Sequence, residues 1–232
     1  RKAVDITNVK TVILDEADEM LSMGFKEELD EILSQLSNTK NKWLFSATIP
    51  QTLDQIINKH MAPDAHRIVV SRSNVINRDI EHQYIACSDN EKLNVLVKFL
   101  GTNKSNRGMI FCRTKVNAQK LSKQLIAKNV AAEALHGDLL QKERDKVMRA
   151  FKKGNLQLIV ATDLAARGID VDSLSFVVHY QMAEKKEYYT HRSGRTARAG
   201  KKGISLCLIT PSDITQMKYF EKELDIKFKK IS

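Results

Sequence analysis

Short apolar runs and segments with helical spacing follow one another along the whole chain. The runs predict strands at 11–14, 43–45 and 67–70, and near 81–87, 108–112, 131–135, 157–161, 175–180 and 203–209. Apolar residues recur three and four positions apart between them, which predicts helices over 25–36, after Pro50, and near 90–100, 115–128, 141–152, 185–197 and 212–223. This alternation favours an α/β fold with a mostly parallel sheet that helices cover on both faces.

Residues 71–79 interrupt the pattern and are the predicted linker between two parts of the chain. The first part, residues 1–70, has only three predicted strands and two predicted helices, which is thin for an independent domain of this class. The sequence also has no Gly-x-x-x-x-Gly-Lys-Ser/Thr phosphate loop. We therefore expect residues 1–70 to be the C-terminal part of a larger domain, and residues 80–232 to form a complete second domain.

Charge is distributed unevenly between the two parts. The net charge is +10 over 232 residues, yet residues 1–77 carry 9 Lys and Arg against 11 Asp and Glu. Residues 78–232 carry 29 basic against 17 acidic residues. This excess predicts an acidic partner, most simply a nucleic acid, for the second part. The aromatic content of 6% is too low for extensive base stacking and favours contacts to the nucleic-acid backbone.

Neither an apolar run of about 20 residues nor a leader-like N-terminus is present, so we expect a cytoplasmic protein without a membrane partner. Cys87, Cys112 and Cys207 have no metal-ligand spacing and are expected to be free thiols in a reducing compartment. Trp43 is expected in a core. Four histidines without partner spacing are expected to be structural: His60, His66, His82 and His179.

The segment 191–200, His-Arg-Ser-Gly-Arg-Thr-Ala-Arg-Ala-Gly, carries three arginines at a spacing of three. If the segment is helical, Arg192, Arg195 and Arg198 share one face. Three guanidinium groups so close repel one another, and their planar forks match phosphate oxygens. The alternative is a solvated basic face, but the small residues between the last two arginines favour a phosphate-facing element.

Carboxylates and hydroxyls follow the first two predicted strands. Asp15-Glu16-Ala17-Asp18 ends the first, and Ser46-Ala47-Thr48 ends the second. In parallel α/β sheets, chemistry takes place at such carboxyl ends of strands. Simple helix capping is the alternative for both groups, before the helix that follows Asp18 and before Pro50.

These motifs, taken in order, resemble a DEAD-box RNA helicase of superfamily 2 that begins late in its first RecA-like lobe. The similarity covers essentially the whole chain, without the family's upstream adenine-reading motif, phosphate loop and first-lobe RNA motifs. The resemblance rests on Asp15–Asp18, Ser46–Thr48, Ile110–Lys115, His136–Asp138, Gln141 with Arg144, Ala161–Asp170 and His191–Gly200.

For the first lobe, the resemblance implies that Asp15 contacts Mg²⁺ through water and that Glu16 polarises the attacking water. Asp18, Ser46 and Thr48 are expected to couple hydrolysis to lobe closure. A hydroxyl at a strand end suits a hydrogen-bond relay rather than bond-making chemistry.

For the second lobe, the resemblance implies three groups of residues. Arg195 and Arg198 are the expected arginine fingers at the nucleotide, with Gly168 and Asp170 beside them and Asp170 toward the ribose. His191 and Arg192 are expected to couple the lobes by hydrogen bonds toward the first. The expected RNA contacts are Arg113, Thr114, Gly137, Gln141, Arg144 and Thr162.

Three alternatives stay open from sequence for these residues. His136-Gly137-Asp138 is also typical of a simple turn between a strand and a helix. Arg144 pairs equally well with an internal acid. Arg167 suits an internal salt bridge better than a catalytic role.

The resemblance implies an ATP-dependent RNA helicase that unwinds short duplexes by ATP-driven lobe closure. Such an enzyme contacts phosphates and 2′-hydroxyls with little sequence preference. The chain alone is expected to be inactive, and unpaired edges of its partial first sheet are expected to favour a dimer. The alternative is a non-catalytic RNA-binding or scaffolding module. A DNA helicase is disfavoured by the Asp-Glu-Ala-Asp and Ser-Ala-Thr pair.

Overall fold

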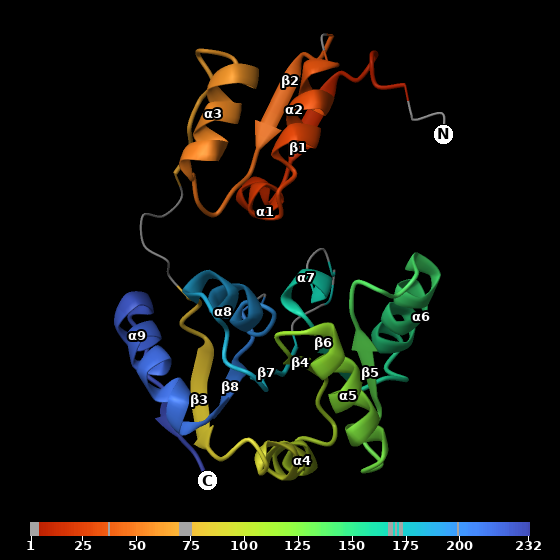
Figure 1. Cartoon of the computed structure of the whole chain (residues 1–232), viewed down its shortest axis with the longest axis vertical. Coiled ribbons are helices and arrows are strands. Elements are labelled where there is room, and N and C mark those ends of the chain that lie inside the picture. Colours follow the sequence, from red (N-terminus) through yellow and green to blue (C-terminus); the bar gives the residue numbers. More distant parts are fainter. Residues whose placement is uncertain are drawn as a thin grey trace. The chain divides into compact units, whose positions relative to one another are not determined.

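The computed structural model describes residues 5–36, 38–69, 76–166, 169, 171, 174–198 and 200–232. The chain divides into two compact units, Arg1–Val70 and Ser71–Ser232, each with its own sheet (Figure 1).

The first unit is a small parallel sheet with helices on one face. Within the described residues, β1 (Thr11–Leu14) pairs with β2 (Asn41–Leu44), so that Leu14 lies opposite Leu44. Three helices accompany them: α1 (Ala17–Ser22), α2 (Lys26–Ser34) and α3 (Gln51–His60). The buried residues Leu29, Leu33, Leu36 and Ile56 form the core, and α3 begins after Pro50 as the sequence predicts.

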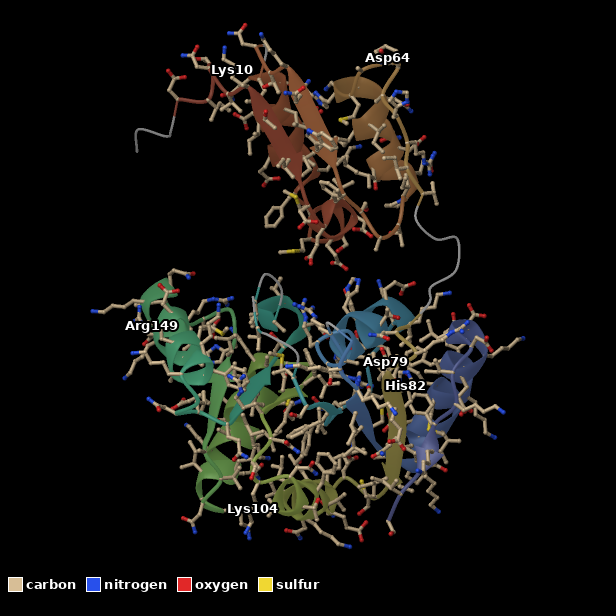
Figure 2. All side chains as sticks on the ribbon, turned by 180° about the vertical axis from the view of Figure 1, so that it is seen from behind. Lys10, Asp64, Asp79, His82, Lys104 and Arg149 are labelled. Atoms are coloured by element: carbon tan, nitrogen blue, oxygen red, sulfur yellow. The ribbon has the colours of Figure 1, made fainter. Side chains whose placement is uncertain are left out.

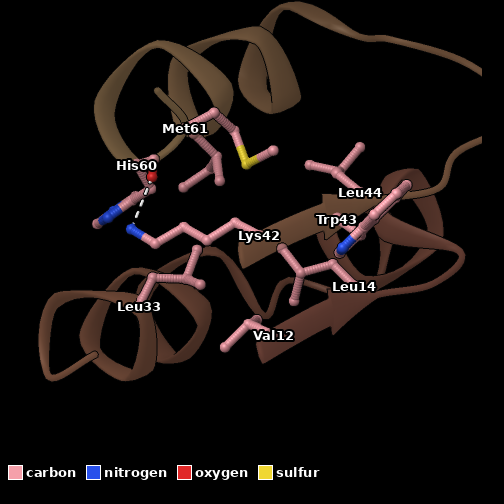
Figure 3. Close-up of a pocket in the computed structure, with 9 residues that line it drawn as sticks. Val12, Leu14, Leu33, Lys42, Trp43, Leu44, His60 and Met61 are labelled. Carbon is pink, nitrogen blue, oxygen red and sulfur yellow. Dashed lines mark hydrogen bonds between the residues drawn. The ribbon is translucent and has the colours of Figure 1, made fainter. Parts of the chain in front are cut away.

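Lys42 attaches the sheet of this unit to α3. Its aliphatic stem lines a small apolar pocket, and its ammonium group donates a hydrogen bond of 2.8 Å to the carbonyl of His60 (Figure 3). That carbonyl belongs to the last turn of α3, where backbone acceptors have no partner inside the helix. His60 Nε2 in turn lies 2.5 Å from Asp30 Oδ1, which joins α3 to α2.

The second unit is built on a parallel sheet with the strand order β5-β6-β4-β7-β8-β3-β9 among the described residues. The first strand of this unit directly follows Asp79 and contains His82, and both residues are labelled in Figure 2. The strands are β3 (Ile80–Ala86), β4 (Gly108–Phe111), β5 (Ala132–Leu135), β6 (Leu158–Ala161), β7 (Phe176–His179), β8 (Gly203–Ile209) and β9 (Lys229–Lys230).

Helices cover both faces of this sheet, as the alternation predicts. On one face, α4 and α5 pack on Ile110, Val178 and Leu206. On the other, α6 and α7 pack on Met109 and Val177, while α8 and α9 pack near Cys207. The helices are α4 (Lys92–Thr102), α5 (Lys115–Ile126), α6 (Gln141–Lys152), α7 (Asp163–Ala166), α8 (Lys186–Ser193) and α9 (Ile214–Leu224).

Two expectations for the first unit are wrong. Residues 67–69 form no strand, and Val70 lies outside the described residues. Trp43 is 56% exposed rather than in a core, and Ile13 and Phe45 are exposed as well. Side chains alternate between the two faces of a strand, and the described helices cover only the face of Val12, Leu14 and Lys42.

Candidate functional site

The carboxylates of Asp15 and Glu16 lie directly after β1 and are exposed. Glu16 has a left-handed backbone, with φ 50° and ψ 42°, a conformation that costs a side-chain-bearing residue about 1–2 kcal/mol. Its N–H donates to Asp15 Oδ1 at 2.9 Å, and its side chain makes no capping hydrogen bond in the described structure. Simple capping of α1 therefore does not account for Glu16, and strain of this kind is common at functional sites.

Asp18, Ser46 and Thr48 form one hydrogen-bond network across the ends of β1 and β2. Thr48 donates to Asp18 Oδ2 through both its backbone N–H, at 2.9 Å, and its hydroxyl, at 2.7 Å. Ser46 Oγ accepts from the N–H of Asp18 and donates to the carbonyl of Thr48 at 2.6 Å. These hydroxyls do not cap α3, whose N-cap residue is Pro50.

The charge of Asp18 is maintained by this network. Burial alone would raise the pKa of the Asp18 carboxyl, but the hydrogen bonds from Thr48, Ser46 and nearby backbone N–H groups together lower it. Asp18 is therefore an ionised acceptor that joins the acidic motif to the Ser-Ala-Thr motif.

In the second unit, four neighbouring strands end side by side. The last residues of β5, β6, β4 and β7 are Leu135, Ala161, Phe111 and His179. Each of them lies directly opposite the last residue of the neighbouring strand. The segments that follow these strand ends carry Gly137, Thr162, Arg113 and Gln181. The fold thus brings together Arg113, Gly137 and Thr162, which the sequence predicts to contact RNA, and places Gln181 beside them.

Hydrogen bonds between these segments fix their arrangement. Lys115 pairs with Asp138 at 2.9 Å, which joins the start of α5 to the turn that contains Gly137. Thr114 Oγ1 accepts from the N–H of Asn117 and is the N-cap of α5. A Cβ placed on Gly137 would meet none of the described atoms within 4 Å, so the space beside this glycine is open.

A second set of contacts joins α6 to the segment after β6. Arg144 Nη2 donates to the carbonyl of Ala165 at 3.2 Å, and Arg144 has no acidic partner within the described part of the chain. Thr162 Oγ1 accepts from the N–H of Ala165 at 3.4 Å. Gln141 is exposed and donates to Asp145. Arg113 is also exposed, with its Nε donating to the carbonyl of Met182 at 2.9 Å.

Arg192 has a different place from the one predicted. Its guanidinium group is buried, with 1% of the residue exposed, and binds Asp163 through two bonds of 2.6 and 2.7 Å. It also donates to the carbonyl of Gln181 and lies 5.3 Å from the centre of the Phe111 ring. The prediction that Arg192 hydrogen-bonds toward the first lobe is wrong, because these partners all lie within the second unit.

The three arginines do not share one helix face. α8 ends at Ser193, Gly194 and Arg195 lie in a turn, and Ala197 has a left-handed φ of 55°. Buried Thr196 donates its hydroxyl to the carbonyl of Leu174, which draws the chain away from the helix axis.

Arg195 and Arg198 remain near the surface in this turn. Arg195 is half-buried and donates to the carbonyl of Ile169 at 3.3 Å. Arg198 is exposed, and its Nε donates to the carbonyl of Gly194 at 2.8 Å. A shallow hollow beside them is lined by Asp163, Tyr188, His191, Arg192 and Arg195. Gly168, Asp170 and Arg167 lie outside the described residues.

Sequence reasoning missed Asp163 and Gln181 as residues that position the site. Asp163 follows the predicted strand 157–161 by two positions, so a carboxylate at a strand end was the available signal. Gln181 Oε1 accepts from the N–H of Arg113 at 2.9 Å and from Asn117 at 3.1 Å. A lone glutamine gives no comparable signal.

Comparison with known proteins agrees with this architecture. The sequence matches the family DEAD/DEAH box helicase over residues 1–56 and the family Helicase conserved C-terminal domain over residues 91–200. The structure matches the C-terminal domain of the DEAD-box protein Dbp5 with a TM-score of 0.62 and 30% identity, covering 67% of this chain and 92% of that one. The chain belongs to the DEAD-box helicase family.

Other DEAD-box relatives match nearly the whole chain. The ATP-dependent RNA helicase CshA of Bacillus cereus is 40% identical over 222 residues, and RhpA of Helicobacter pylori is 38% identical over 216. These alignments cover 96% and 93% of this chain but only 42% and 44% of the relatives, so the chain spans less than half of their length.

Two longer solved structures cover both units. A DEAD box protein from Methanococcus jannaschii has a TM-score of 0.64 and 39% identity, over 99% of this chain and 61% of that one. Saccharomyces cerevisiae Dbp5 bound to RNA and ADP BeF3 has a TM-score of 0.87 and 29% identity, over 97% and 60%. None of the helices in the described part of this DEAD-box chain is long and apolar enough to cross a membrane.

Proposed function

We propose that this chain is part of an ATP-dependent RNA helicase that unwinds short RNA duplexes as ATP closes two RecA-like lobes. In this proposal residues 1–70 belong to the first lobe, 71–79 are the linker and 80–232 are the second lobe. The observation that supports it best is the Asp18–Ser46–Thr48 network, which ties the acidic motif to the Ser-Ala-Thr motif. A scaffold has no need of such a connection.

Asp15 and Glu16 have the exposure and position that ATP hydrolysis needs. An exposed carboxylate suits Mg²⁺, a hard ion that usually keeps several waters and takes one or two protein ligands. In this proposal the contact comes from Asp15 alone, through water. Bound there, Mg²⁺ would neutralise phosphate charge, while Glu16 orients and polarises the attacking water.

The second unit supplies the remaining roles in this proposal. Arg195 and Arg198 stabilise charge on the transferred phosphoryl group, Gly168 and Asp170 contact the nucleotide, and His191 couples the two lobes. RNA phosphates and 2′-hydroxyls bind without sequence preference at the strand ends and the first turn of α6, which carry Arg113, Thr114, Gly137, Gln141, Arg144 and Thr162.

Two further properties belong to the proposal. The exposed apolar residues Ile13, Trp43 and Phe45 on the sheet of the first unit favour dimerisation of the isolated chain. Light scattering over a range of concentrations tests this, and a constant monomer mass contradicts it. The free thiols Cys87, Cys112 and Cys207 support a cytoplasmic location.

RNA-stimulated ATP hydrolysis by the full-length protein tests the proposed function. Glu16→Gln keeps the size of the side chain but removes the charge that polarises water, so we expect turnover to fall by a factor of about 10² or more. Glu27→Gln, at an exposed position on α2, is the matched control and leaves turnover unchanged. Turnover that is absent in the unmodified protein, or that ignores Glu16, favours a non-catalytic RNA-binding module. The isolated chain, whose sequence has no phosphate loop, is expected to show negligible ATPase activity.

A further inference from the structure

A groove of about 370 Å³ opens in the second unit between the end of β3, the end of β8 and the start of α9. Its walls are largely apolar and include Ala86, Ile209, Pro211, Ile214 and Met217. None of these residues is among those to which the proposed function assigns ATP or RNA. The groove therefore has no task in the activity proposed above.

The local structure explains why the groove is open. α9 follows a 3₁₀ turn, η1 (Pro211–Asp213), which Thr210 and Asp213 fix by hydrogen bonds of 2.7 and 3.0 Å. Met217 and Phe220 are buried against the sheet, but Ile214, one turn earlier on α9, is 41% exposed. The first turn of α9 thus leaves apolar surface uncovered.

Among the described residues, the outer edge of β3 is paired over a short stretch beside the groove. β9 pairs with β3 only opposite Gln83 and Tyr84. The residues at the end of β3 that follow, Ala86 to Ser88, line the groove. Apolar surface next to the outer edge of a strand is a typical docking place for an extended peptide.

Two lysines from different elements, Lys218 of α9 and Lys230 of β9, also line the groove. Neither ammonium group has an ion-pair partner among the residues that the structure describes, whereas the neighbouring Lys229 binds Glu81 at 3.1 Å. Asp89 and Asp213, the acids next in sequence to the groove wall, are already engaged by Lys92 and Thr210. The apolar floor therefore lies beside positive charge that this unit does not neutralise.

We propose that this groove docks an acidic peptide segment of a partner protein, with one or two large apolar side chains in the cavity and carboxylates at Lys218 and Lys230. Charge complementarity favours an acidic segment, because a basic or neutral peptide would leave the ammonium groups of Lys218 and Lys230 without an ion-pair partner. The apolar floor disfavours RNA, whose backbone offers only polar and charged groups.

An unbiased selection tests the chemistry of the occupant. A displayed library of random decapeptides is selected on the 232-residue chain. We expect the selected sequences to combine Asp or Glu with Leu, Ile, Phe or Trp, and to bind more weakly at high salt. A selection that yields no binders, or only basic ones, overturns the proposal.

Charge reversal locates the binding. Lys218→Glu combined with Lys230→Glu should weaken binding of the selected peptides by about ten-fold or more. Lys222→Glu is the matched control, because Lys222 is an exposed lysine one turn further along α9 that does not line the groove. Equal losses in both variants overturn the proposal, since they would reflect net charge alone.

Cys87 provides a direct readout of occupancy. It lines the groove and is partly exposed, whereas Cys112 and Cys207 are buried. Burial raises the pKa of the Cys87 thiol, so alkylation with iodoacetamide is followed in mildly alkaline buffer. We expect the selected peptides to slow this alkylation at least about five-fold at saturation. Peptides that bind without protecting Cys87 overturn the proposal, and so does protection by decanoate alone, which would make the groove a site for small amphiphiles.

Discussion

The two units each fix a strand-end segment through an aspartate, but with different partners. In the first unit, the carboxylate of Asp18 accepts from the hydroxyl and the N–H of Thr48, and its own N–H donates to Ser46 Oγ. In the second, Asp163 is held by the buried guanidinium group of Arg192 through two charged bonds. Neutral donors at a partly exposed acid contribute about 1 kcal/mol each, whereas breaking a buried ion pair leaves a charge without compensation.

The buried ion pair of Arg192 also distinguishes two arginines within the segment 191–200: one supports the fold, and the other lies at the surface. Arg192 and Arg195 are three positions apart, yet the first is buried in the core of the second unit and the second lies at its surface. The motif match alone assigns Arg192 to coupling between the lobes and Arg195 to the nucleotide, and so gives both a part in the activity. The structure assigns Arg192 to the integrity of the fold.

The largest stability effect is expected from Arg192→Ala. Removal of the guanidinium group leaves Asp163 and the carbonyl of Gln181 without their donors, which should lower the unfolding free energy of the second unit by about 3–5 kcal/mol. Circular dichroism follows mainly this unit, which contains most of the described helices, and fluorescence of Trp43, the only tryptophan in the sequence, follows the first. Arg149→Ala, at an exposed position on α6 labelled in Figure 2, should change neither signal. A loss below about 1 kcal/mol for Arg192→Ala would show that the pair is not a structural one.

Acidification should weaken the second unit before the first. Burial lowers the pKa of His82 to about 4. The pKa of His179 lies well below its ordinary value, because burial and the nearby charges of Arg192 and His82 oppose the protonation of His179. Unfolded histidines take up a proton below about pH 6.5, so stability falls as the pH drops from there toward 4, by about 1.4 kcal/mol per pH unit for each histidine.

For Asp18 the sign is different. Its pKa is lowered in the folded state, so its contribution is complete above about pH 4 and is lost only as the pH falls below that value. Unfolding of each unit between pH 7 and pH 3 checks this order, with His66→Gln, at an exposed position in the first unit, as a neutral control. Simultaneous weakening of both units near pH 6 would contradict it.

The smallest stability effect is expected from Thr48→Val. The substitution removes one hydroxyl donor to Asp18 but retains the backbone N–H donor, which should cost the first unit about 1 kcal/mol. Trp43 fluorescence during urea unfolding measures the effect. Thr52→Val, at an exposed position on α3, is the control. An equal loss of unfolding free energy in both variants would show that the hydrogen bond to Asp18 does not stabilise the first unit.

The sequence was sufficient for the regular elements of the fold. The strand β8 and the helix α6 have the bounds that apolar periodicity predicts, because β8 is almost entirely buried and α6 packs Val147, Met148 and Phe151 against the core. Periodicity failed at 185–197, where Gly194 and the left-handed Ala197 end the helix early. It also failed at Trp43, because the burial of a strand residue depends on whether another element covers its face.

The chemistry of single residues was less accessible from sequence. The motif residues Asp18, Ser46 and Thr48 were predicted to act together and are bonded to one another. The pairing of Arg192 with Asp163, 29 residues away, depends on how the segment after β6 lies against α8, which no local pattern contains.

The measurement that tests the account most directly is RNA-stimulated ATP hydrolysis by full-length protein carrying Arg195→Ala, together with the thermal unfolding of the same variant. Arg195 is half-buried, whereas Arg192 is fully buried in an ion pair, so we expect a smaller loss of stability than for Arg192→Ala. Turnover should fall by a factor on the order of 10³, as expected for loss of an arginine finger, while Lys201→Ala leaves it unchanged. Retained turnover, or a loss no larger than the loss of folded protein, would contradict the account.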